Sequence, residues 1–86
     1  MPEISRFFGI VITMYYNDHS PPHFHVRYGN QKALININDL CILEGFLSPR
    51  VRGLVIEWAS IYQNELLNNW NHARNNETLT KIPPLE

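Results

Sequence analysis

The chain has 86 residues, 44% of them hydrophobic, and a formal net charge of −1, with 7 Lys and Arg against 8 Asp and Glu. This length predicts one small domain over residues 1–86, and the charge gives no support for broad capture of nucleic acid, although a small local site stays open. A single cysteine excludes a disulfide within the chain, and the sequence shows neither a signal peptide nor an apolar run of about 20 residues, so we expect a cytoplasmic protein and no membrane contact.

Residues 3–46 are predicted to be β-rich. The stretch "RFFGIVITMYY" carries aromatic and β-branched residues that favour one strand, interrupted at Gly9. "HFHVRY" alternates strictly and is followed by "GN" at positions 29–30, a pair typical of hairpin turns. "KALINI" and "CILEG" supply the next strands. The pattern predicts an antiparallel sheet of three to four strands.

Residues 48–76 are predicted to form one long helix, followed by a tail over residues 77–86. Ser48 is a natural N-cap and Pro49 suits the first helical position. Apolar residues recur every three or four positions and include Trp58 and Trp70. At 1.5 Å per residue a straight helix would be roughly 39 Å long, more than a small sheet needs, so we expect a kink or a protruding end. The tail is expected to add a short edge strand at 79–82.

The two regions predict an α+β fold in which the apolar stripe of the helix packs on one face of the sheet. Strand alternation sends Phe24, Val26 and Tyr28 towards this core. The same alternation places His23, His25 and Arg27 together on the other side.

The stretch "NDHSPPHFHV" is the main candidate for chemistry, and three interpretations are open. Asp18, His19, His23 and His25 offer three imidazoles and a carboxylate, which would suit a divalent metal such as zinc. Alternatively, His23 or His25 acts as a general acid or base while Arg27 holds a phosphate, an arrangement suited to RNA cleavage. In the third interpretation, the histidines are structural and hydrogen-bond neighbouring groups. The sequence leaves open whether the protein is an enzyme.

The same stretch, with "LEG", "EWA", "NELLNNW" and "KIPPLE", resembles a bacterial family of domains of unknown function, number four thousand one hundred and sixty. The resemblance covers almost the whole chain, and "DHSPPHFH" is its most specific part. It implies a short, stand-alone protein, often encoded beside another small protein in an arrangement like a toxin–antitoxin module. Some relatives are described as transcriptional regulators. The resemblance brings no established catalytic residue.

Thr13 departs from the family pattern, because many members have a basic residue there, and this departure weakens a nuclease interpretation. The small core and the incomplete catalytic set favour a protein-interaction component of a two-gene module. Its partner would be a small protein from an adjacent gene or a second copy of the chain. A histidine site for a metal or RNA cleavage is the alternative. A regulator is the third hypothesis, although one predicted helix provides no helix-turn-helix.

Overall fold

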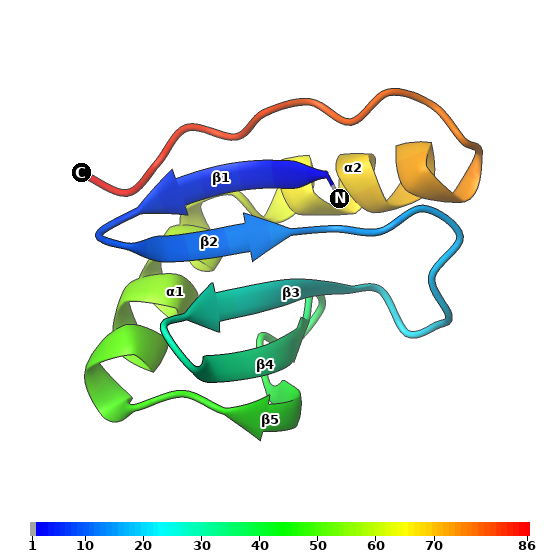
Figure 1. The fold of residues 1–86 in the computed structure, drawn as a ribbon. Helices are drawn as coiled ribbons and strands as arrows, with labels where there is room; N and C mark the ends of the chain where they lie inside the picture. The colour runs from blue at the N-terminus through cyan, green and yellow to red at the C-terminus, as the bar shows by residue number, and fades with distance from the viewer. Residues whose placement is uncertain (1) are drawn as a thin grey trace.

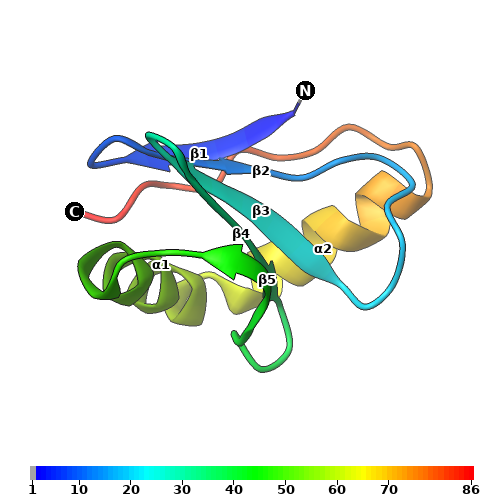
Figure 2. The same cartoon turned by 60° about the horizontal axis from the view of Figure 1, so that its bottom comes forward.

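The computed structural model describes residues 2–86 and consists of two layers, a five-stranded sheet with two helices against one of its faces (Figures 1 and 2). The strands are β1 (Glu3–Phe7), β2 (Ile10–Thr13), β3 (His23–Tyr28), β4 (Gln31–Asn36) and β5 (Ile42–Phe46). They lie in the sheet in chain order, and each is antiparallel to the next. The predicted α+β class with an antiparallel sheet is therefore confirmed.

The expectation of three to four strands was wrong, because the first apolar stretch forms two strands. Phe8 and Gly9 have φ values of 51° and 78°, and Phe7 pairs with Ile10 across them. Two successive residues with positive φ make the tight turn that suits the twist of a hairpin. The ring of Tyr28 approaches this turn so closely that a Cβ at Gly9 would lie 3.3 Å from it. Gly9 thus marks a chain reversal inside the stretch expected to be one strand.

The prediction of a single long helix was wrong, although the expected kink is present. Two helices, α1 (Pro49–Ile61) and α2 (Gln63–Arg74), are separated at Tyr62, whose φ and ψ are −111° and 28°. The side-chain amide of Gln63 donates to the carbonyls of Ile37 and Asn38, which fixes the break against the loop between β4 and β5. The change of direction lets both helices follow one face of a short, twisted sheet. Neither helix of the described chain combines the length and apolar character needed to cross a bilayer.

The core lies between the two layers and centres on Trp58. Its indole is fully buried and packs against the rings of Phe7 and Phe24, with centroid separations of 5.3 and 5.9 Å. Phe24 and Val26 are 0% and 2% exposed, as strand alternation predicts. Tyr28, at the end of β3, was also expected in the core but is 39% exposed, beside Phe8 and the first turns of α1. Trp70 of α2 continues the core towards the start of β3.

The C-terminal tail runs beside β1 (Figure 1), although the strand expected at 79–82 does not form. The amide of Ile82 donates to the carbonyl of Ile4 at 2.8 Å, and the indole N–H of Trp58 donates to the carbonyl of Pro83. The buried amide of Asn69 both donates to and accepts from the backbone of Thr80. The tail thereby covers the β1 edge of the sheet, whereas no further strand of residues 2–86 pairs with β5 at the other edge.

Candidate metal centre and adjoining groove

The loop between β2 and β3 carries Asp18 to the start of β3. Asn17 donates from its backbone amide to the carbonyl of Ala73, and its side chain donates to Asn76, so the loop is fastened to the end of α2. The next residue turns its carboxylate towards the sheet. One oxygen, Oδ1, accepts the backbone amide of His19 at 2.9 Å. The other oxygen is left to face the side chains of β3.

Two histidines of β3 meet this second oxygen. Nε2 of His23 and Nε2 of His25 each lie 3.0 Å from Oδ2 of Asp18. The two residues are separated by one position, so their side chains leave the strand on the same side, as predicted. The potential ligand atoms of the three residues lie within 4.8 Å of one another. This arrangement is the candidate metal centre.

The contacts of His23 define which of its nitrogens carries a proton. Nδ1 lies 2.7 Å from the carbonyl oxygen of Pro21, which only accepts, so Nδ1 must donate. In a neutral ring Nε2 then presents a lone pair, yet it faces a carboxylate oxygen of Asp18, which is also an acceptor. A second proton or a cation between the two atoms makes this contact favourable. A backbone carbonyl that orients one nitrogen while the other binds the ion is the usual environment of a metal-binding histidine.

The three groups differ in their access to solvent. The side chain of His23 is 1% exposed, that of Asp18 17% and that of His25 28%. The ring of His23 is enclosed by the indole of Trp70, at a centroid separation of 5.2 Å, whereas Tyr15 stands edge-on to His25 at 4.4 Å. The cluster is therefore closed on the side of α2 and open on the side of His25.

The carboxyl of Asp18 is held in its charged form. Burial raises its pKa, but the hydrogen bond with His25, the backbone amide of His19 and the nearby ring of His23 together lower it by more. The net result is a pKa below the ordinary value for an aspartic acid. An ionised carboxylate is the form in which Asp18 would bind a cation.

The structure places the other candidate residues around this cluster. His19 lies at the rim, with its side chain 73% exposed and its Nε2 3.9 Å from Oδ1 of Asp18. Arg27 follows His25 on the same face of β3, one row further along the sheet. His72, the fourth histidine, lies on α2 outside the cluster of ligand atoms, and its Nδ1 is buried without a hydrogen-bond partner among the described residues.

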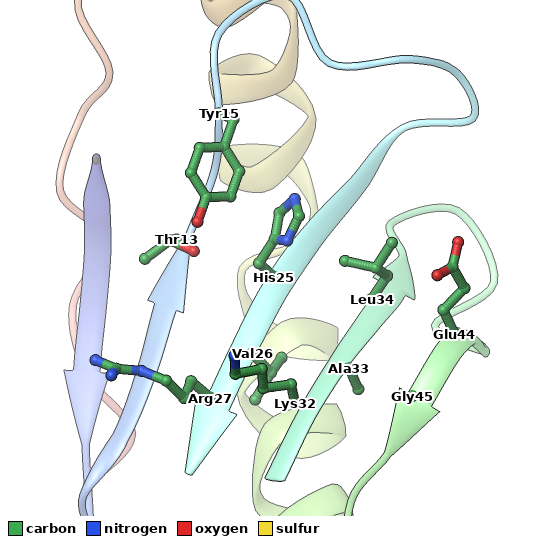
Figure 3. Close-up of a pocket in the computed structure, with 10 residues that line it drawn as sticks. All are labelled: Thr13, Tyr15, His25, Val26, Arg27, Lys32, Ala33, Leu34, Glu44 and Gly45. Carbon is green, nitrogen blue, oxygen red and sulfur yellow. The ribbon is translucent and has the colours of Figure 1, made fainter. Parts of the chain in front are cut away.

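A hollow of about 590 Å³ lies on the outer face of the sheet, opposite the helices, and His25 is part of its wall (Figure 3). Thr13 and Leu34 flank His25 on the neighbouring strands, and Glu44 follows on β5. The next row contains Arg27 and its partner Lys32. The hollow thus joins the open side of the candidate metal centre to a pair of cationic side chains.

Two charged residues of this hollow, Lys32 and Glu44, were not predicted from the sequence. Lys32 was not predicted as a site residue, although the two-residue turn at Gly29 and Asn30 fixes the register that pairs it with Arg27. The position of Glu44 in the hollow depends on how β5 pairs with β4. This pairing contains a register irregularity, and no turn signal in the sequence predicts it. The hairpin signal in the sequence was therefore sufficient to place Lys32 opposite Arg27, whereas the position of Glu44 could be found only from the tertiary structure.

A protein-family model for a domain of unknown function, DUF4160, matches residues 9–71, so the chain belongs to this family and the predicted resemblance is confirmed. The matched residues contain the loop with Asp18, all of β3 and most of the helical layer. No curated protein and no solved structure matches the chain.

Proposed function

We propose that this member of the DUF4160 family binds a divalent transition metal, with zinc as the leading candidate, through Asp18, His23 and His25. The observation that carries the proposal is the orientation of His23. Its Nδ1 is committed to the carbonyl of Pro21, and its Nε2 faces the carboxylate of Asp18 at 3.0 Å. Ligands of a tetrahedral ion bound at about 2.0–2.2 Å lie roughly 3–3.5 Å apart, which is close to this separation.

Two histidines and one carboxylate leave part of the coordination sphere of a metal open. His25 borders the hollow on the outer face, so an open position would be reached from that side. His19, exposed at the rim, is the candidate fourth ligand. A metal with a vacant position can polarise a bound ligand or lower the pKa of a bound water, which is the chemistry we assign to the centre.

The test is metal binding by the untagged protein. Elemental analysis after purification, followed by calorimetric titration of chelator-treated protein with Zn²⁺, is expected to give one ion per chain. The Asp18→Asn and His25→Gln variants are expected to bind at least about tenfold more weakly, since even residues that only orient ligands contribute 10–100-fold. His72→Gln removes a histidine outside the cluster and serves as the matched control.

A proton is the competing occupant between His23 and Asp18. If the wild-type chain binds no Zn²⁺, or if the double variant Asp18→Asn, His25→Gln binds it as well as wild type does, the proposal is wrong. Nitrogen NMR of the metal-free chain then shows whether His23 carries protons on both nitrogens. If both nitrogens of His23 are protonated and Zn²⁺ does not displace the proton on Nε2, the cluster has a structural role.

A protein partner is a second candidate function, supported by the unpaired edge of β5. Edge strands with free backbone groups accept a further strand from another chain. Leu43 and Phe46 on β5 are 42% and 66% exposed. We propose that a small protein encoded beside this chain, or a second copy, adds to this edge.

The experiment for this second candidate is co-expression with the product of the adjacent gene, followed by sedimentation. We expect a complex or a dimer that Phe46→Lys weakens. Ile61→Lys, which replaces another exposed apolar residue at the end of α1, is expected to have no effect. A monomer in both the isolated and the co-expressed samples would exclude the interaction.

A further inference from the structure

We infer that the hollow on the outer face is a binding site for a small phosphorylated ligand of nucleoside monophosphate size, held by Arg27 and Lys32. This inference goes beyond metal binding, because it concerns the row of side chains next to His25 and holds with or without an ion in the centre.

The pairing of Arg27 with Lys32 is the main observation. The two residues are directly opposite each other on β3 and β4, and both are exposed on the outer face. Like charges placed directly opposite in an antiparallel pair repel and destabilise the sheet. Within residues 2–86, neither side chain has a carboxylate within ion-pair distance. An anion between them would remove this repulsion.

The acidic residues of this face do not fill that role. The pKa of Glu3 is lowered mainly by its hydrogen bonds with Arg6, and the charge of Arg27 makes only a minor contribution. The two carboxylate oxygens of Glu3 accept from Arg6 at 2.8 and 3.1 Å. Glu44 lies on the row of His25, and Figure 3 shows it on the far side of the hollow from Arg27. No carboxylate is thus left between the two cations, and Figure 3 shows the side chain of Arg27 extending over β2 from the edge of the hollow.

The chemistry of the pair selects a phosphate group. A guanidinium binds two oxygens of a phosphate in parallel, and an ammonium adds a compact point charge. Thr13 contributes a hydroxyl to the same lining. A phosphate on Arg27 and Lys32 would leave the remainder of the ligand over His25 and Tyr15.

The dimensions and the remaining walls select a small ligand with a flat, partly polar body. Small-molecule sites are typically about 300–1,000 Å³, and the volume of about 590 Å³ lies within this range. The aromatic rings of Tyr15 and His25 are in edge-to-face contact on one side, and Leu34 lines the other. A mononucleotide combines the phosphate and the flat heterocycle that these walls would accept.

The experiment is a titration of the chelator-treated chain, and of the Zn²⁺-loaded chain, with inorganic phosphate, AMP and a short oligoribonucleotide, followed by amide NMR. We expect AMP to bind with a dissociation constant of about 1 mM or tighter. Shifts should centre on β3 and β4 in both forms. Arg27→Gln and Lys32→Gln are each expected to weaken AMP binding about tenfold. Arg52→Gln, which removes an exposed arginine of α1, is the control and should not change it.

Both site variants are expected to fold, because each removes one charge of a repelling pair. Their thermal midpoints at low salt should equal or exceed that of wild type, and inorganic phosphate should raise the wild-type midpoint more than chloride at equal ionic strength.

Absence of AMP and phosphate binding, or AMP binding unchanged in the double variant Arg27→Gln, Lys32→Gln, would overturn the inference. Tight binding of the oligoribonucleotide without AMP binding would also overturn it, since the ligand would then be an RNA chain. None of these outcomes depends on whether Zn²⁺ binds.

Discussion

Asp18 and His23, five positions apart in the chain, are joined by a contact of 3.0 Å between Oδ2 and Nε2. The other ring nitrogen of His23 faces the carbonyl of Pro21, so the imidazole lies between two acceptors. This relationship is the observation on which the proposed cation site rests. It also makes the site sensitive to the charge of Asp18.

The acid stability of the metal-free chain is expected to depend on Asp18. Burial raises the pKa of its carboxyl, the contacts with His25, the amide of His19 and His23 lower it by more, and the net folded-state pKa is depressed. A depressed pKa contributes stability above the unfolded-chain value of about 3.9, and this stability is lost as the pH falls through the folded-state pKa. Asp18→Asn should therefore be less stable than wild type at pH about 5, and the difference should shrink towards pH about 2.

Urea denaturation in the presence of a chelator, at a series of pH values, measures this difference. Glu57→Gln, on the exposed side of α1, is the control and should leave the acid limb unchanged. A difference between wild type and Asp18→Asn that does not vary with pH would show that the contacts of Asp18 do not persist in solution.

Phe24→Ala is expected to lower the free energy of unfolding by about 3–5 kcal/mol. Phe24 is 0% exposed and packs against Trp58, so its removal leaves a cavity between the layers. Tyr28 is on the same face of β3 but is 39% exposed, and Tyr28→Ala should cost clearly less. Equal losses in denaturant titrations of the two variants would contradict the arrangement of β3 against the helices.

Asn69→Ala is expected to loosen the C-terminal tail. The buried amide makes two hydrogen bonds with the backbone of Thr80, and leaving these groups unsatisfied costs about 1–3 kcal/mol. Hydrogen exchange at the amide of Ile82, which donates to Ile4, should become faster. Asn71→Ala, on the exposed side of the same helix, is the control. Unchanged protection of Ile82 would show that the tail is held without Asn69.

Two glycines are expected to respond in opposite directions to replacement by alanine. Gly45 has a φ of 89°, and a Cβ there would overlap the backbone carbonyl of Lys32, so Gly45→Ala should destabilise the β4–β5 pair by about 1–3 kcal/mol. Gly53 lies in α1 with nothing within 4 Å of an added Cβ. Gly53→Ala should raise the unfolding free energy by about 0.5–1 kcal/mol. Thermal and urea unfolding of both variants check this contrast, and a stabilising Gly45→Ala would contradict the close approach of β5 to β4.

Local chemistry was enough to predict several features of the chain. Alternation through β3 correctly placed Phe24 in the core and put His23 and His25 on one side of the strand, because side chains of a strand alternate by backbone geometry alone. The helix begins at Pro49 with Ser48 as its N-cap residue, as predicted, although the hydroxyl of Ser48 makes no capping bond. Proline at this position is a property of helix starts that needs no tertiary contact.

The tertiary structure decided the remainder, since it depends on contacts between segments distant in the chain. The helices break at Tyr62 because the sheet that they cover is short and twisted, and Gln63 is hydrogen-bonded to the turn that follows β4. Asp18 reaches both histidines because its loop is fastened to α2, and no local pattern in the sequence encodes that distance. Trp70 packs on His23 and buries it, whereas His25 lies on the open outer face beside the hollow. Backbone geometry thus determined which side chains share a face, and the packing of α2 determined which of them meets solvent.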